Sequence, residues 1–218
     1  AKYVVAGIGD TPVLNADDHG AYIIGYTDGT VRPLNNIVRE EVATIFFRLL
    51  TEAAGEAMHK EVAPYSDVPA TKWSSTAIAT LSNGGYITGR PDGTFGPNDY
   101  ITRAEFAAIV VRLKGQEAQA NGAKAATMFA DVPADHWAAG YVATGTSATA
   151  SNFINGYSET SFGPEDNVTY AQAVKMLIAA LGYGSYAETE GGWPNGYLKY
   201  GYSLELTKGI TNFSNDKA

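Results

Sequence analysis

The sequence predicts a mainly α-helical domain built from tandem helix–loop–helix repeats, and two observations carry this prediction. The stretch Gly89–Lys114 (GRPDGTFGPNDYITRAEFAAIVVRLK) encodes a turn and a loop that lead into an amphipathic helix. Similar stretches begin at Gly25 and Gly156, so the three starts are 64 and 67 residues apart. A second motif, in which D-V-P-A precedes a tryptophan, recurs between these stretches.

Local chemistry accounts for each part of the stretch that begins at Gly89. Asp92-Gly93 is a turn signal, because glycine tolerates the positive φ of tight turns. Thr102 and Glu105 form a T-x-x-E capping box, in which each side chain satisfies a free N–H at the helix start. The apolar residues that follow at helical spacing predict one buried stripe: Phe106, Ile109, Val110 and Leu113.

The repeats divide into two kinds of half, which are offset by half a repeat along the chain. The loop-and-helix stretches, called back halves here, span 25–50, 89–114 and 156–181. The front halves span 65–88, 129–155 and 192–210, and in the first two D-V-P-A leads into a helix that carries a tryptophan. The last front half is recognised by its tryptophan-to-glycine spacing and has no back half after it. In the first front half, Gly84-Gly85 is expected to end the helix.

The offset leaves the first back helix and the last front helix each with an uncovered apolar face. We expect these two helices to pair, either within one chain, which closes a pseudo-threefold ring, or with a neighbouring copy. The chain is expected to form one composite domain over 1–218, with three polar, alanine-rich surface linkers at 51–63, 116–126 and 183–190. Residues 1–24 stay unassigned, although Tyr3-Val4-Val5 suggests a short strand.

Composition excludes several classes of function. The 218 residues include no cysteine, so disulfides and thiolate metal sites are excluded. A net charge of −8 argues against nucleic acid or an anionic membrane as a bulk partner, and no run approaches the ~20 apolar residues of a membrane span. No signal peptide is visible at Ala1, as expected of a cytosolic chain, a processed one or part of a longer one.

The succession of these motifs resembles the S-layer homology (SLH) domain family. The motifs are D-V-P…W, then G-(Y/R)-x-D-G-T-(F/V)-x-P, then I-T-R-A-E and an apolar helix, and they cover about three quarters of the chain. The resemblance implies a trimer of repeats shaped as a three-pronged spindle around a central helical bundle. It also implies a secreted module that anchors a protein to the cell surface by binding pyruvylated secondary cell-wall polysaccharide, without covalent attachment. In the family, the arginine of T-R-A-E and the front-half aromatic residue are among the residues of the binding grooves between prongs.

The three repeats match the T-R-A-E motif unevenly. The middle repeat keeps all four residues at 102–105, with Arg103 inside the capping box. The first repeat reads V-R-E-E at 38–41, so it keeps Arg39 and loses the capping hydroxyl. The third reads T-Y-A-Q at 169–172, so Thr169 and Gln172 keep the capping box while the charge is lost. We therefore expect two competent grooves at most.

Arg39 and Arg103 are the leading candidates for ligand binding, because a guanidinium can grip the carboxylate of a pyruvyl ketal with two hydrogen bonds. The alternative for each is a surface salt bridge to a nearby acid. The three tryptophans either stack on sugar rings or anchor their helices in the core: Trp73, Trp137 and Trp193. Equivalent loop positions that are expected to line a groove hold Tyr26, Arg90 and Tyr157.

The motifs for other chemistry are missing. The D-G turns lack the dense oxygen ligands of an EF-hand, and His19, His59 and His136 have no metal-ligand spacing. Neither a G-x-S-x-G elbow nor a phosphate-binding loop occurs, so we expect no cofactor, no metal and no catalysis. Two alternatives stay open. One is a structural protein that self-assembles into a surface lattice or filament, and the other is a glycan hydrolase with paired carboxylates.

Overall fold

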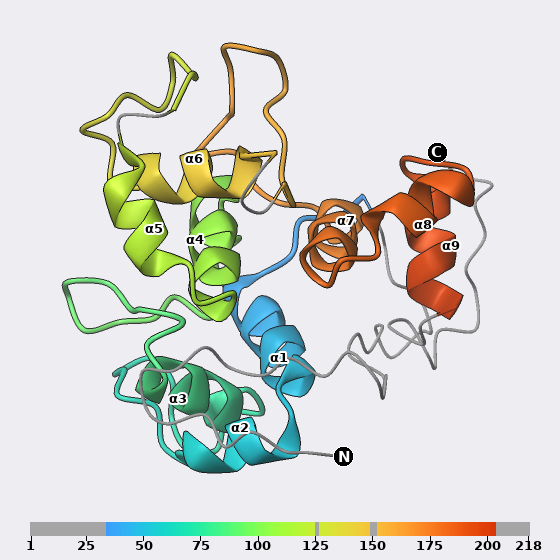
Figure 1. Ribbon diagram of the computed structural model, residues 1–218. Helices are drawn as coiled ribbons and strands as arrows, with labels where there is room; N and C mark the ends of the chain where they lie inside the picture. The colour runs from blue at the N-terminus through green and yellow to red at the C-terminus, as the bar shows by residue number, and fades with distance from the viewer. Residues whose placement is uncertain (1–33, 125–126, 149–151, 204–218) are drawn as a thin grey trace.

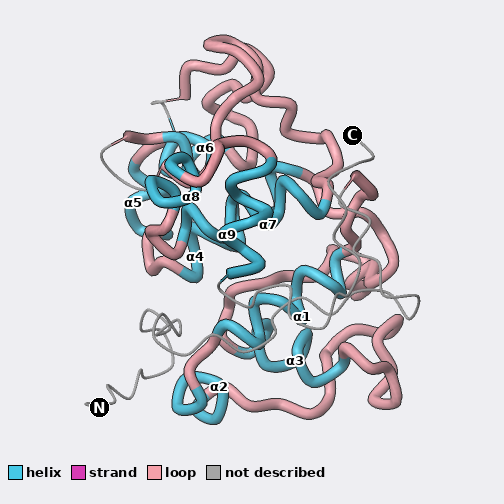
Figure 2. The backbone as a smooth tube through the Cα atoms, turned by 90° about the vertical axis from the view of Figure 1, so that its right-hand side faces the viewer, coloured by secondary structure: helices cyan, strands magenta, loops and turns pink. Residues whose placement is uncertain are grey.

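The computed structural model describes residues 34–124, 127–148 and 152–203, and this part of the chain is mainly helical (Figure 1). Within these ranges there are helices and long loops but no β-strand, as Figure 2 shows. The mainly α fold class is therefore confirmed. The suggested strand Tyr3-Val4-Val5 lies outside the described residues.

The helices fall into three groups, each with a long helix, a short helix and a further helix. The first group contains α1 (Arg39–Leu49), α2 (Glu52–Ala57) and α3 (Ser75–Asn83). The second contains α4 (Arg103–Leu113), α5 (Glu117–Gly122) and α6 (Ala139–Thr146). The third contains α7 (Tyr170–Ala180), α8 (Gly184–Thr189) and α9 (Asn195–Ser203). Figure 1 shows the groups around a common centre, and no helix of the described ranges is long and apolar enough to cross a membrane.

The segments that precede α1, α4 and α7 are joined by a closed cycle of backbone hydrogen bonds. The N–H of Ile37 donates to the carbonyl of Val168 at 2.9 Å, and the N–H of Val168 donates to the carbonyl of Ile101 at 3.0 Å. The N–H of Ile101 completes the cycle by donating to the carbonyl of Ile37 at 3.2 Å. All three side chains are buried. The first and third back halves are therefore connected within one chain.

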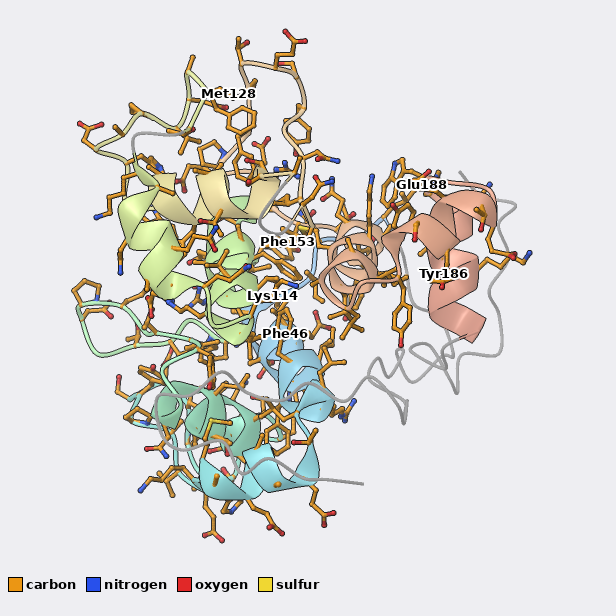
Figure 3. All side chains as sticks on the ribbon, in the orientation of Figure 1. Phe46, Lys114, Met128, Phe153, Tyr186 and Glu188 are labelled. Carbon is orange, nitrogen blue, oxygen red and sulfur yellow. The ribbon has the colours of Figure 1, made fainter. Side chains whose placement is uncertain are left out.

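Apolar side chains from α1, α4 and α7 also meet at the centre. The rings of Phe46, labelled in Figure 3, and Phe106 lie 5.5 Å apart, and both line a small apolar cavity together with Val174 and Leu177 of α7. The helical spacing of these residues predicts the buried stripe that forms here.

The pairing of front and back helices differs from the expectation. Each front helix packs against the back helix that precedes it in the chain: α3 against α1, α6 against α4, and α9 against α7. The expectation that the last front helix would cover the first back helix is therefore wrong. One short helix and its loops separate the helices of each pair, and in the second and third groups that short helix packs against both of them.

The three stretches expected to be surface linkers are not irregular, because each contains a short helix: α2, α5 or α8. Ala54, Ala120 and Ala187 of these helices are buried. A Cβ added at Gly140 of α6 would lie 1.9 Å from the carbonyl oxygen of Ala120, so only glycine permits this approach of α6 to α5. The alanine-rich composition thus allows close helix packing.

The aspartate of each D-V-P motif holds the loop that leads to the next group. The carboxylate of Asp67 accepts the N–H groups of Phe95 and Gly96, both at 2.8 Å. Asp131 accepts those of Phe162 at 2.9 Å and Gly163 at 2.8 Å. The first two front halves therefore pack on the preceding back helix and also hold the following loop, which links two helix groups.

Candidate functional site: two grooves that pair an arginine with a tryptophan

The capping boxes at the starts of α4 and α7 are both formed. Thr102 Oγ1 accepts the N–H of Glu105 at 3.2 Å, and Glu105 Oε2 accepts the N–H of Thr102 at 3.0 Å. Thr169 Oγ1 accepts the N–H of Gln172 at 3.3 Å, and Gln172 Oε1 accepts the N–H of Thr169 at 3.0 Å. Glutamate and glutamine thus serve equally as the second residue of the box. Each box places the residue after its threonine at the first helical position.

Arg39, the first residue of α1, is buried, with only 7% of its surface exposed. Its Nε donates to the carbonyl of Phe95 at 2.9 Å, and its Nη2 donates to the carbonyl of Thr88 at 3.1 Å. Nη1 donates to Glu105 Oε1 at 2.5 Å, and the guanidinium lies 4.6 Å from the centre of the Phe95 ring. The ion pair considered in the sequence analysis exists, but its arginine is buried rather than on the surface. Arg39 thereby joins α1 to the start of α4.

Arg103 occupies the equivalent position at the start of α4 and is 4% exposed. Its Nε donates to the carbonyl of Phe162 at 2.9 Å, and its Nη2 donates to the carbonyl of Asn155 at 2.6 Å. The guanidinium lies 4.3 Å from the ring centre of Tyr157 and 4.6 Å from that of Phe162. Nη1 has no hydrogen-bond partner among the described residues, and Gln172 occupies the position that corresponds to Glu105, the partner of Arg39.

A cavity of about 180 Å³ opens beside Arg39 and is called the Arg39 groove. Besides Arg39, its wall includes Arg90 of the 87–95 loop, Glu105 and Arg112 of α4, and Trp137, which lies just before α6. Each of the three arginines has an acidic partner: Arg39 with Glu105, Arg90 with Asp99 at 2.6 Å, and Arg112 with Glu117 at 3.0 Å. The cations of this groove are therefore already neutralised by the protein.

A second cavity of about 180 Å³ opens beside Arg103 and is called the Arg103 groove. Its wall includes Tyr157, Gln172, Lys175 and Trp193. The loop that forms one side begins at Phe153, which Figure 3 labels between the second and third helix groups. Neither Arg103 nor Lys175 forms an ion pair with any residue in the described part of the chain.

The tryptophans lie before the front helices rather than within them. Trp73, Trp137 and Trp193 each precede their helix by two residues, because the D-V-P stretch or its counterpart makes its own turn first. They are 62%, 51% and 45% exposed. The interpretation that they anchor helices in the core is therefore wrong.

The structure brings most of the sequence-predicted site residues into two separate sets. Arg90 and Trp137 join Arg39, and Tyr157 and Trp193 join Arg103. Trp73 lines neither of these two cavities, and Tyr26 lies outside the described residues.

Sequence reasoning missed Lys175, whose Nζ lies 5.1 Å from the ring centres of both Trp193 and Tyr197. Lys175 follows Gln172 by three residues, so both lie on one face of α7. The equivalent residue of the middle repeat is Ala108, and this difference between repeats was the available signal. A lysine ammonium close to two aromatic rings contributes positive charge at a site that is also suited to stacking.

A family model described as S-layer homology domain matches residues 64–107 and 129–174. Each matched region contains a front half and most of the back half that follows it. The Arg103 motif lies in the first region, and the start of α7, which lines the Arg103 groove, lies in the second.

Several curated proteins of bacterial surfaces are similar to the chain. Cell surface glycoprotein 1 of Acetivibrio thermocellus is 37% identical over 182 residues, which covers 79% of this chain and 8% of that protein. The surface layer protein of Brevibacillus choshinensis is 33% identical over 184 residues, covering 84% of this chain and 16% of that protein. The cellulosome-anchoring protein of A. thermocellus is 31% identical over 165 residues, which covers 75% of this chain and 36% of that protein. The chain thus spans a small part of each relative's length.

Proposed function

The chain belongs to the S-layer homology (SLH) domain family, and from that premise we propose that it is a non-catalytic module that anchors a protein at the cell surface. Its partner in this proposal is an anionic secondary cell-wall polysaccharide that carries pyruvyl ketals. The observation that carries the proposal is the composition of the two grooves. Each combines a buried arginine with an exposed tryptophan at one cavity of about 180 Å³.

The arginine and the tryptophan of the Arg103 groove match the two parts of a pyruvylated sugar. A guanidinium binds a carboxylate through charge-assisted hydrogen bonds, which are stronger than neutral ones. An exposed indole offers a flat apolar face to the C–H groups of a sugar ring. The hydrogen bonds of Arg103 to the carbonyls of Phe162 and Asn155 hold its guanidinium in place before a ligand arrives. Such preorganisation reduces the entropy cost of binding.

The architecture suits attachment to a polymer. We propose that the three helix groups are the prongs of a three-pronged spindle and that the grooves lie between neighbouring prongs. Two grooves on one chain can bind two units of one glycan, and linked binding events raise the overall affinity well above that of a single groove. This accounts for firm attachment without a covalent bond.

The named relatives support the same proposal, because they are described as a cell surface glycoprotein, a surface layer protein and a cellulosome-anchoring protein. Since the chain corresponds to 8–36% of their lengths, the anchoring role is proposed for this module and not for a whole protein. The remaining activities of a longer chain would lie elsewhere.

Isothermal titration calorimetry with purified cell-wall polysaccharide tests the proposal. We expect saturable binding to the native glycan and at least tenfold weaker binding after chemical removal of its pyruvyl groups. Trp193→Ala should weaken binding, whereas Met128→Ala, at a 73% exposed residue that lines neither groove, is the matched control. Equal affinity for the native and the depyruvylated glycan would overturn the proposed role of the carboxylate.

A further inference from the structure

We infer that the two grooves take chemically different sugar units: the Arg103 groove takes the acidic, pyruvylated unit and the Arg39 groove takes a neutral unit. This inference rests on the proposed function, because it assigns ligands to the same two cavities. It arises from a difference between corresponding positions of α4 and α7, which are 67 residues apart.

The wall of the Arg39 groove and the corresponding positions of the next repeat differ in charge at four places. Glu105 in the wall of the Arg39 groove corresponds to Gln172 in the wall of the Arg103 groove, and Ala108 corresponds to Lys175. Both of these changes make the Arg103 groove more positive. Arg90 and Arg112 of the Arg39 groove correspond to the uncharged Tyr157 and Ala179, but each of those arginines is paired with an acid, Asp99 or Glu117. Neither of the two changes at 105 and 108 is offset by such a pair. Neither change affects the capping box, which forms with Glu105 and with Gln172 alike.

In the Arg39 groove the protein itself supplies the anion. Glu105 Oε1 receives the Nη1 hydrogen bond of Arg39 at 2.5 Å, and the other two groups of that guanidinium are bound to backbone carbonyls. A ligand carboxylate that approached Nη1 would meet the like charge of Glu105, which is unfavourable in a partly buried site. A neutral sugar unit stacked on Trp137 avoids this repulsion.

In the Arg103 groove no carboxylate of the described residues forms an ion pair with the arginine. Nη1 of Arg103 has no hydrogen-bond partner among the described residues, although the side chain is 4% exposed. Asp166 and Asp131 lie close enough to attract the charge of Arg103, but neither lines the cavity, and Asp131 accepts the N–H groups of Phe162 and Gly163. A ligand carboxylate that reached Nη1 would therefore gain a charge-assisted hydrogen bond without displacing an acid of the protein.

Lys175 extends the positive region to the tryptophan side of the Arg103 groove. It is half-buried, and its Nζ lies 5.1 Å from the centre of the Trp193 ring. The ammonium of Lys175 and the guanidinium of Arg103 line the same cavity as Trp193. A sugar stacked on Trp193 would therefore lie close to two positive charges. This combination fits a sugar whose ring carries its own carboxylate, as a pyruvyl ketal does.

Because the chain has three tryptophans, NMR of the ¹⁵N-labelled indoles reports binding at each groove separately. The ligand is a methyl hexopyranoside with a 4,6-linked pyruvyl ketal, and the methyl ester of its carboxyl group serves as the neutral probe. We expect the Trp193 indole signal to shift at an about tenfold lower concentration of the acid than the Trp137 signal does. With the ester, this preference should disappear.

Two reciprocal variants test the cause of the preference. Gln172→Glu should weaken binding of the acid at Trp193 by about tenfold, and Glu105→Gln should strengthen its binding at Trp137 by a similar factor. Both substitutions exchange residues that already serve in capping boxes, so both boxes should still form. Glu105→Gln also loses the ion pair with Arg39, so its melting temperature should fall further than that of Gln172→Glu. Lys175→Ala, on the groove wall, is a further variant that should weaken binding at Trp193 even if Glu105→Gln fails to fold.

The outcomes separate this inference from the proposed function. The inference would be overturned if the acid bound with equal affinity at Trp137 and Trp193. It would also be overturned if Gln172→Glu and Lys175→Ala left binding of the acid unchanged. Either outcome would leave the anchoring proposal standing. A lack of any indole shift with either the acid or the native polysaccharide would overturn both.

Discussion

Arg39 Nη1 lies 2.5 Å from Glu105 Oε1, and this contact joins the first helix of one group to the first helix of the next. Glu105 therefore has two roles, because its other oxygen, Oε2, caps α4 through the N–H of Thr102. The residue that starts one helix also positions the arginine of its neighbour. The arginines of this fold are thus part of its architecture as well as candidates for binding.

Arg39→Ala should lower the free energy of unfolding by about 2–4 kcal/mol, because it removes a buried guanidinium that binds two carbonyls and a carboxylate. Urea denaturation measures this change. Arg90→Ala is the control, since its pair with Asp99 is exposed and should contribute less than about 1 kcal/mol. Equal effects of the two substitutions would contradict the structural role assigned to Arg39.

Asp131→Asn should destabilise the protein by about 1–3 kcal/mol at neutral pH, because the amide cannot replace a carboxylate that accepts several hydrogen bonds. Burial alone would raise the pKa of Asp131, but the bonds from the Gly163 and Phe162 amides and the Ser161 hydroxyl outweigh burial and lower it.

The lowered pKa of Asp131 fixes the sign of the pH dependence. A carboxylate whose pKa is lower in the folded state stabilises the fold above its unfolded pKa, near 3.8, and loses this effect as pH falls through the folded pKa. The difference between the wild type and Asp131→Asn should therefore shrink below about pH 4. Urea denaturation at several pH values, with the exposed Asp135→Asn as the control, measures it. A difference that grew in acid would refute the assignment.

Gly140→Ala should destabilise the protein by about 1–3 kcal/mol, because the added Cβ would lie 1.9 Å from the carbonyl oxygen of Ala120 and force α5 and α6 apart. Gly55→Ala in α2 is the matched control, since no atom lies within 4 Å of its added Cβ. That substitution should stabilise the helix by about 0.5–1 kcal/mol. Thermal unfolding of the two variants should therefore show melting temperatures that move in opposite directions.

Local features of the fold were predictable from the sequence, because they depend on neighbouring residues. The capping boxes at Thr102 and Thr169 form, and Gly84 ends α3 as expected. The apolar residues Ala77, Ile78 and Leu81 are buried, as their helical spacing indicates.

The pairing of halves was not predictable from the same pattern. A front helix buries the same apolar face whether it packs on the preceding or on the following back helix. The sequence of α9 therefore did not indicate that it packs on α7. The repeat pattern also identified the tryptophans, but it did not show that they lie before their helices rather than within them. Arg39 and Arg103 were identified as candidates, but their depth depends on carbonyl groups from loops about 50 residues away, which no local pattern contains.

Co-sedimentation with bacterial cell walls tests the central claim most directly. The chain is mixed with walls before and after chemical removal of their acidic polysaccharide, and the bound fraction is measured. If the chain is an anchor for that polysaccharide, it sediments with the intact walls and stays in solution with the stripped ones. Equal sedimentation with both preparations would contradict the claim.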